Sequence, residues 1–386
     1  MPAVIVVGAG PVGTLLAGLL RRGGVDVLLL ERREQAGGGT RAIGIHAPVL
    51  AALEPSGLTD ALLADARRVP RGEARADGRR LGVVRFDRLS TRFPFVATLP
   101  QSQTESVLAG TAPAPRRGFA VSRVQRTGRM LSVLGANGER EAAPIVVIAG
   151  GGRARPLVYR GDRLGVTTYP DRYVMADIAV PGHPHPDTAI VNLARGGVLE
   201  SFPMPAGVRR FVAWDTAGEP AHDRGTAGAD PSAAAADRLR AALRSRGEPD
   251  AGEAVTTATT FGVRRVVAPA LVRGALFVIG DTAHEVSPIG GQGMNLGLLD
   301  AATLAPLLTR WVRDGAPPEA ELSRWERRRV RSAATAARLA AVNTALGRPL
   351  GIRAHSGRGM LVRGMLAGPA GRAFAHAYAM GLDADA

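Results

Sequence analysis

AVIVVGAGPVGTLLAGLLRRGGVDVLLLE, residues 3–31, is the stretch that decides the fold. It opens on a short, apolar and largely β-branched run over residues 3–7, which is typical of a parallel strand buried on both faces. A glycine-rich turn follows, and the apolar residues 14–20 predict a helix after it. Residues 25–30 form a second apolar strand that ends at Glu31. The order of strand, glycine turn, helix and strand predicts a parallel βαβ unit.

The glycine turn has the spacing GxGxxG, which indicates a dinucleotide site when it joins a strand to a helix. Gly8 permits the tight turn, Gly10 lets a pyrophosphate approach the backbone, and Gly13 allows close packing of helix on strand. The helix N-terminus offers free N–H groups to phosphates. Glu31 is placed to accept hydrogen bonds from a ribose diol, and Arg32 either contacts that ribose or faces solvent. The motif alone does not separate NAD from FAD. The predicted dinucleotide-binding residues are Gly8, Gly10, Pro11, Val12, Gly13, Glu31 and Arg32.

The composition excludes several other classes of function. The chain has no cysteine, which rules out disulfides, thiolate metal sites and a cysteine nucleophile. Its seven histidines have no metal-ligand spacing, so we expect no metal. The formal charge of +15 comes from 49 basic residues, all arginine, against 34 acidic ones. Because these arginines are spread along the chain and aromatic residues make up only 4%, we expect no nucleic-acid binding.

The length of 386 residues indicates two or three packing units. No segment approaches the roughly 18–20 apolar residues that a membrane span requires. The first residues lack the charged region of a signal peptide. We therefore expect a cytoplasmic protein without a transmembrane segment.

A second informative stretch, GALFVIGDTAHEVSPIGGQGMNLG, covers residues 274–297. Residues 276–279 predict another buried strand, with Asp281 at its carboxyl end. A loop rich in proline and glycine follows, and the apolar spacing over 294–308 predicts a helix. Such a loop brings free N–H groups and a helix N-terminus close to a flat or anionic ligand.

This stretch resembles the FAD-dependent aromatic hydroxylases, the group typified by para-hydroxybenzoate hydroxylase and the ubiquinone-pathway hydroxylases. Their GD motif, the proline that follows and the GGQGMN loop are all present at 280–295. Residues 41–46 (RAIGIH) resemble the segment that passes beside the isoalloxazine ring. Residues 99–101 (LPQ) with Glu105 resemble the segment whose glutamine meets the ribityl-phosphate part of FAD. The resemblance spans the chain and is most specific in the first fifty residues and around 274–300.

The resemblance implies roles for individual residues, each with a structural alternative. Asp281 would bind the ribityl chain or cap its loop. Amides of the 288–295 loop would stabilise negative charge at the N1–O2 edge of the flavin. Arg41 would lie over the flavin, meet the nicotinamide donor or face solvent. His284 would orient the loop, donate near flavin or substrate, or be structural. The cofactor residues implied are Arg41, Gln101, Asp281, Pro288, Gly291, Gly293, Met294 and Asn295, and the catalytic ones are Arg41, His284 and Pro288.

One segment departs from the family pattern. Relatives carry an Asp-Gly motif after the strand that corresponds to residues 145–148. Here the sequence is Ala-Gly-Gly-Gly-Arg over 149–153, and Gly151 stands where the aspartate is expected. The motif is associated with both FAD and reduced nicotinamide, so its loss supports a redox-neutral alternative. Arg153 and Arg155 make the same loop cationic, which would favour NADPH over NADH.

The middle of the chain has a different pattern. Residues 189–193, 197–204 and 208–214 alternate in the way of antiparallel strands, with a Pro-Ala-Gly turn at 205–207. Such a sheet would form the ceiling of a substrate cavity. We expect some of Phe202, Met204 and Trp214 to face that cavity, with ordinary core packing as the alternative. The arginine-rich run 324–331 is interpreted as the solvated face of a long helix.

The predicted fold class is α/β, with a discontinuous Rossmann-like FAD-binding domain, an inserted antiparallel substrate domain and a helical C-terminus. The boundaries are 1–70, 98–160 and 262–320 for the FAD domain, 71–97 and 161–261 for the substrate domain, and 321–386 for the C-terminal helices. The implied function is an FAD-dependent monooxygenase that uses O2 and NADPH or NADH. It would hydroxylate or epoxidise an electron-rich aromatic, polyketide or quinol-type molecule through a flavin C4a-hydroperoxide. The alternative is a redox-neutral FAD-containing cyclase or isomerase, and the oligomeric state is left open.

Overall fold

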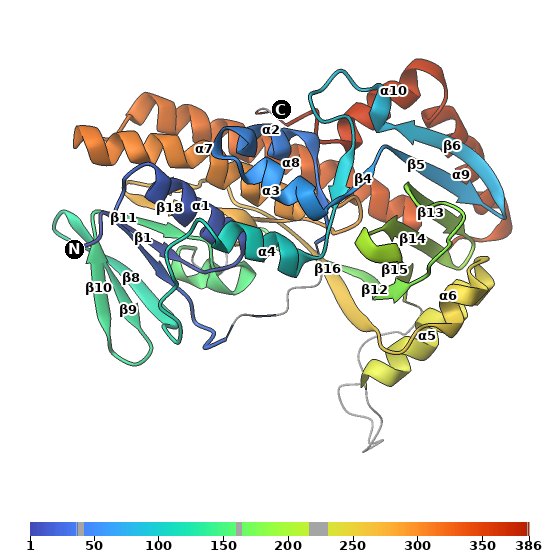
Figure 1. The fold of residues 1–386 in the computed structure, drawn as a ribbon, viewed down its shortest axis with the longest axis horizontal. Coiled ribbons are helices and arrows are strands. Elements are labelled where there is room, and N and C mark those ends of the chain that lie inside the picture. The colour runs from blue at the N-terminus through green and yellow to red at the C-terminus, as the bar shows by residue number, and fades with distance from the viewer. Residues whose placement is uncertain (36, 38–41, 160–163, 216–230, 384, 386) are drawn as a thin grey trace.

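The structure, a computed structural model, describes residues 1–35, 37, 42–159, 164–215, 231–383 and 385. It is built around a five-stranded and an eight-stranded sheet, seen on the left and on the right of Figure 1. Both sheets contribute residues to one cavity. Two long helices, α7 (Gly293–Asp314) and α8 (Glu319–Gly347), run across the top of that view.

The five-stranded sheet has the order β17-β18-β11-β1-β2, in which only β17 is antiparallel to its neighbour. Its strands come from distant parts of the chain, so the predicted discontinuous sheet is confirmed. The helix that follows β1, α1 (Pro11–Arg22), begins three residues earlier than predicted, because proline is well suited to the first helical position. The strands are β1 (Val4–Val7), β2 (Val27–Leu30), β11 (Ile145–Ile148), β17 (Val272–Arg273) and β18 (Leu276–Val278).

The eight-stranded sheet has the order β19-β16-β12-β15-β14-β13-β5-β6. The three strands predicted between 189 and 214 lie at its centre and are antiparallel, as expected. One face packs an apolar cluster against α5 (Pro231–Ser245). The other face lines the cavity. The strands are β5 (Arg71–Ala76), β6 (Arg79–Arg85), β12 (Thr167–Ala179), β13 (Thr188–Ala194), β14 (Gly197–Pro203), β15 (Val208–Trp214), β16 (Thr259–Val267) and β19 (His284–Glu285).

Two small antiparallel sheets and several short helices complete the fold. One has the order β3-β7-β4, and the other, β10-β9-β8, packs beside β1 and β11. Within the described ranges, no helix combines the length and apolar character needed to cross a membrane. These elements are β3 (Gly44–Ile45), β4 (Arg67–Val69), β7 (Val96–Thr98), β8 (Val121–Thr127), β9 (Met130–Gly135), β10 (Arg140–Ala143), α2 (Ala47–Leu53), α3 (Leu58–Asp65), α4 (Gln101–Ala109), α6 (Pro249–Glu253), α9 (Ile352–Met365) and α10 (Gly368–Tyr378).

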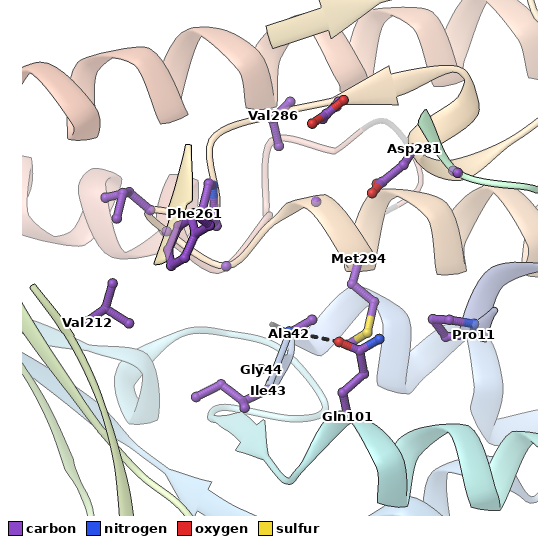
Figure 2. A pocket seen from close by; sticks show the side chains of 18 of the residues that line it. Pro11, Ala42, Ile43, Gly44, Gln101, Val212, Phe261, Asp281, Val286 and Met294 are labelled. Atoms are coloured by element: carbon purple, nitrogen blue, oxygen red, sulfur yellow. Dashed lines mark hydrogen bonds between the residues drawn. The ribbon is translucent and has the colours of Figure 1, made fainter. Parts of the chain in front are cut away.

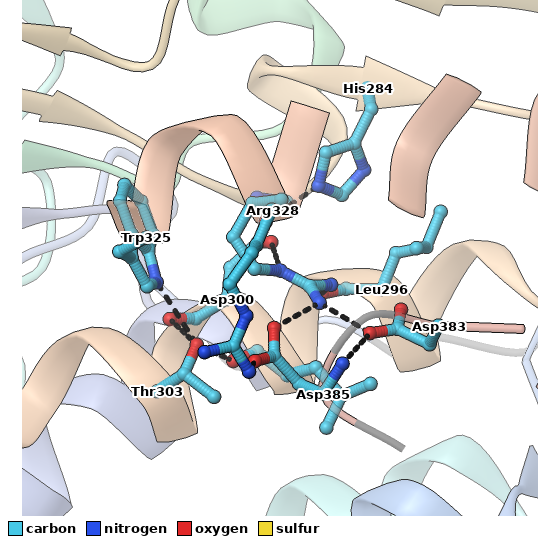
Figure 3. A network of polar contacts seen from close by, with 11 residues as sticks. His284, Leu296, Asp300, Thr303, Trp325, Arg328, Asp383 and Asp385 are labelled. Carbon is cyan, nitrogen blue, oxygen red and sulfur yellow. Dashed lines mark hydrogen bonds and ion pairs between the residues drawn. The ribbon is translucent and has the colours of Figure 1, made fainter. Parts of the chain in front are cut away.

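The arginine-rich run on α8 corrects one expectation. Arg324, Arg327, Arg328 and Arg331 are exposed, as predicted for a solvated face. Arg329 is fully buried instead, and its Nε donates to Asp300 Oδ1 at 2.8 Å. Figure 3 shows the surrounding network, in which Asp300 on α7 also meets His284 and the C-terminal Asp383 and Asp385 lie close by. The run therefore ties α8 to α7 and to the end of the chain.

Candidate functional site

A cavity of about 1130 Å³ lies between the two large sheets. This exceeds the roughly 300–1,000 Å³ of most small-molecule sites, so there is room for a dinucleotide together with a second molecule. In Figure 2, Pro11 and Asp281 lie toward one end of the pocket, and Val212 and Phe261 lie toward the other. The first end belongs to the glycine turn and the GD motif, and the second to the eight-stranded sheet.

The glycine turn forms a cradle that side chains would fill. Gly8 has φ +109°, and a Cβ there would lie 2.6 Å from the Ala149 carbonyl oxygen. A Cβ on Gly13 would lie 1.9 Å from the Gly8 carbonyl oxygen, so only glycine lets α1 approach β1 this closely. Gly10 lines the cavity, and a Cβ on it would meet no protein atom within 4 Å. No side chain caps α1, so its first N–H groups are available to an anion. This geometry fits the pyrophosphate of a dinucleotide.

Glu31 lies at the end of β2 and lines the cavity. Its carboxylate accepts hydrogen bonds from the Ala9 amide at 2.8 Å and from the Arg33 amide and Nε at 3.0 and 2.9 Å. Burial raises the pKa of Glu31, but these hydrogen bonds outweigh it and lower the pKa below its usual value. Arg33, which sequence reasoning missed, is thus the partner that holds this carboxylate ionised. Arg32 is an exposed residue that also lines the cavity.

Asp281 and Gln101 lie on two other segments of the same wall. Asp281 follows β18 in a short 3-10 turn, lines the cavity and is exposed. Gln101 begins α4, and its Oε1 accepts the Ala42 amide at 3.1 Å, as Figure 2 shows. Its Nε2 donates to Glu105 Oε1 at 2.9 Å, so the LPQ segment and its glutamate act together. Arg41 lies outside the described residues.

The loop before α7 presents backbone to the cavity. Gly290 and Gly291 have φ of +103° and +67°, conformations that favour glycine, and no side chain caps the 22-residue α7. The amides at this helix N-terminus favour negative charge. Of the predicted residues, Pro288, Gly291, Gly293 and Met294 of this segment line the cavity, as do Pro11 and Val12 at the start of α1.

Asn295 and His284, two of the predicted site residues, are hydrogen-bonded to other parts of the protein. Neither belongs to the described cavity lining. The Asn295 Oδ1 accepts the His46 amide at 2.9 Å, and its Nδ2 donates to the carbonyls of Gly44 and Gly291 at 2.8 and 2.9 Å. His284 Nε2 lies 2.5 Å from Asp300 Oδ2. Both side chains therefore hold the loop through contacts within the protein. For His284 this is the structural role that the sequence left open as an alternative.

The loop at Gly151 is less cationic than the sequence suggested. Arg155 is buried and donates to the Asp281 carbonyl at 2.7 Å and to Glu285 Oε2 at 2.5 Å, so its charge is balanced inside the protein. Arg153 is exposed and lines the cavity. Gly151 has φ +72° and lines the cavity too, and a Cβ on it would meet no protein atom within 4 Å. The missing carboxylate therefore leaves open space.

The ceiling of the cavity comes from the face of the eight-stranded sheet that was expected there. Phe202 lines it, whereas Met204 and Trp214 are not among the described lining residues. Met204 lies just beyond the end of β14 and is buried in the core. Trp214 packs edge-on against Tyr173, with ring centroids 5.6 Å apart. Met204 and Trp214 therefore follow the alternative stated for them in the sequence analysis, which is ordinary packing in the core.

Among the lining residues that sequence reasoning missed are Glu200, His46 and Tyr378. Glu200 is buried on β14, two residues from Phe202 on the same face, and strand parity was the signal that could have found it. His46 and Tyr378 lie together, with ring centroids 6.4 Å apart. Burial lowers the pKa of His46 to about 4, so this ring is neutral at physiological pH. The pairing of His46 with α10 could not be read from local sequence.

Comparisons with known proteins agree with this geometry. A family model described as FAD binding domain matches residues 1–147 and 179–340. The 6-methylpretetramide 4-monooxygenase of Streptomyces rimosus is 33% identical over 332 residues, which cover 82% of this chain and 57% of that relative. This chain thus spans little more than half the length of that relative.

Two solved structures extend the likeness to the whole fold. An anhydrotetracycline hydroxylase from Streptomyces rimosus has a TM-score of 0.76 and 26% identity, covering 99% of this chain and 76% of its own. A p-nitrophenol 4-monooxygenase from Pseudomonas putida DLL-E4 has a TM-score of 0.84 over 98% of both chains, and its 21% identity shows a common fold only. The chain therefore belongs to the FAD-dependent aromatic hydroxylase family.

Proposed function

We propose that the protein is a monooxygenase that uses bound FAD, NADH or NADPH and O2 to hydroxylate or epoxidise an electron-rich aromatic, polyketide or quinol-type molecule. The observation that carries this proposal is the continuity of one cavity from the glycine cradle to an apolar sheet ceiling. In such a reaction one oxygen atom enters the substrate, the other leaves as water, and the nicotinamide supplies two electrons. FAD, when bound, supplies the electron transfer and the oxygen chemistry.

The protein's own residues would bind, orient and exclude water. Amides at the N-terminus of α7 favour the negative charge that the reduced isoalloxazine carries. Asp300 Oδ2 accepts the Gly280 amide at 3.0 Å, which fixes the turn that presents Asp281. The apolar ceiling, with Val198, Phe202 and Val212, keeps the reaction space dry. The relatives named for 6-methylpretetramide and anhydrotetracycline support a polycyclic polyketide as the substrate class.

Anaerobic mixing of the purified yellow protein with NADH or NADPH tests the proposal. We expect the flavin absorbance to bleach slowly with the nucleotide alone and faster when a suitable phenolic or polyketide compound is present. Bleaching speeds up because the compound favours the flavin position that is exposed to the donor. Arg153 is the exposed arginine of the Gly151 loop that lines the cavity, so both nucleotides are compared.

The same experiment separates the second candidate, a redox-neutral cyclase or isomerase. Gly151 favours that candidate, because a carboxylate is absent from a wall of the cavity where the family has one. If neither nucleotide reduces the flavin and product forms without oxygen while the flavin stays oxidised, the monooxygenase proposal is wrong.

Removing either carboxylate of the FAD site is expected to weaken FAD binding. Glu31→Ala and Asp281→Ala each remove a charge-assisted hydrogen bond, worth about 1.5–3 kcal/mol or roughly ten- to a hundredfold in Kd. Their effects should be nearly additive, because they act on different parts of the dinucleotide. Titration of the apoprotein with FAD measures the Kd of each variant. Glu34→Ala, which removes an exposed charge near Glu31, is the matched control and should bind FAD normally. Unchanged affinity in both test variants would mean that FAD is placed wrongly.

A further inference from the structure

Glu200 is a carboxyl group in the apolar ceiling of the cavity. It lies in the middle of β14 and is 3% exposed. The strand register places Val191 of β13 and Val212 of β15 directly opposite it. Val198 and Phe202 precede and follow it on the same face, and all four neighbours line the cavity with it. The carboxyl is therefore surrounded by apolar side chains of the proposed substrate space.

The described part of the chain offers this carboxyl no hydrogen-bond or ion-pair partner. A buried polar group without a partner is costly, so it calls for an explanation. The two arginines of the eight-stranded sheet that line the same cavity have partners of their own. Arg210 of β15 donates from two nitrogens to Asp177 at 2.6 Å each, and Arg264 of β16 lies 3.7 Å from Glu285.

The titratable groups around Glu200 are neutral. Tyr173 of β12 and Tyr378 of α10 sense its charge, and burial together with Glu200 raises the pKa of both phenols. His46 is neutral as well. Glu73 of β5 lines the cavity but pairs with Arg75 at 2.6 Å. Burial raises the pKa of Glu200 to about 8.

A carboxyl in these surroundings is a carboxylic acid at neutral pH, and its O–H is a hydrogen-bond donor. Apolar walls with a donor among them suit a flat, uncharged molecule that carries an acceptor oxygen. We propose that Glu200 recognises a keto or quinone oxygen of an uncharged polycyclic aromatic substrate by donating a hydrogen bond to it. This inference rests on the proposed function and narrows its substrate class.

The donor exists only while Glu200 is protonated. The hydrogen bond to a ketone is therefore fully present only at pH values well below about 8, and it is lost as the pH rises through the pKa of the carboxyl. The amide of a glutamine keeps an N–H donor at every pH, whereas leucine keeps the volume and has no donor.

The test compares two probes, 2-acetylnaphthalene and 2-ethylnaphthalene, which differ in one carbonyl oxygen. Calorimetric titration of the holoprotein gives the Kd of each probe for wild type, Glu200→Gln and Glu200→Leu. We expect Glu200→Leu to raise the Kd of the ketone about three- to tenfold relative to that of the hydrocarbon. As the pH is raised from 6.5 to 9.5, the wild type should lose its preference for the ketone over the hydrocarbon. Glu200→Gln should keep that preference over the same range. Glu73→Gln, which alters another carboxyl of the cavity, should retain the wild-type pH dependence.

An unchanged ratio of the two Kd values in Glu200→Leu would overturn the inference, as would a pH dependence that Glu73→Gln abolishes and Glu200→Gln does not. All variants should contain FAD in wild-type amount, because Glu200 lies on the eight-stranded sheet and not among the residues proposed to bind FAD. Failure of the proposed function is seen in a different measurement. Flavin that stays oxidised with NADH and NADPH contradicts the monooxygenase, whereas the ratio of the two probe Kd values still reports on Glu200.

Discussion

Arg329→Met is expected to lower the free energy of unfolding by about 3–5 kcal/mol, because it leaves a buried charge without its partner. Arg329 is fully buried, donates to Asp300 Oδ1 at 2.8 Å and to the Leu296 carbonyl at 3.0 Å, and pairs with Asp383 at 2.8 Å. Burial raises the pKa of Asp300, but His284 and Arg329 beside it more than compensate, so the carboxylate is ionised. Urea denaturation with saturating FAD measures the loss.

The neighbouring Arg328 provides the matched control. It lies on the same helix, is 46% exposed in its side chain and pairs with Asp385. Because exposed ion pairs contribute little, Arg328→Met should change the free energy of unfolding by no more than about 1 kcal/mol. Equal losses in the two variants would contradict the role assigned to the buried network. Asp300→Asn should weaken FAD binding as well, since it disturbs the hydrogen bond to the Gly280 amide.

The sequence did contain a signal for the burial of Arg329. Trp325, Arg329, Ala333, Ala336 and Ala340 follow one another at spacings of three and four residues, and all of them are buried. That spacing is the apolar stripe of a helix, with one arginine inside it. The density of charge over residues 324–331 suggested a solvated face. The helical spacing of the buried residues would have predicted more accurately that Arg329 is buried. The partners Asp300 and Asp383 could not be predicted, because they are brought to α8 only by the tertiary fold.

The glycine cradle at one end of the cavity could be predicted because its geometry is local. The cradle from Gly8 to Gly13 is set by the backbone of one strand, one turn and one helix. By contrast, Asn295 accepts the His46 amide across 249 residues of sequence, and local sequence could not reveal that contact. The substrate end depends on register between strands. Strand parity selected Phe202, which lines the cavity, and the same parity includes Glu200, which was overlooked because it is polar.

Gly10→Ala and Gly13→Ala should separate loss of FAD from loss of structure. A Cβ on Gly13 would lie 1.9 Å from the Gly8 carbonyl oxygen, so backbone must shift and we expect a destabilisation of about 1–3 kcal/mol or more together with loss of FAD. Gly10 has φ −81° and ψ 179°, which any residue adopts, and a Cβ there meets no protein atom within 4 Å. Gly10→Ala should therefore leave the apoprotein as stable as wild type.

The same Gly10→Ala substitution should still weaken FAD binding about ten- to a hundredfold, because the methyl group takes up space in the cavity where the pyrophosphate approaches the backbone. Thermal denaturation of the apoprotein and titration with FAD give the two quantities independently. Gly357→Ala on α9, where a Cβ also meets nothing within 4 Å, controls for the added methyl and should bind FAD normally. Normal FAD affinity in Gly10→Ala would show that the dinucleotide does not cross this turn, because the protein itself has room for the methyl group and only a ligand would exclude it.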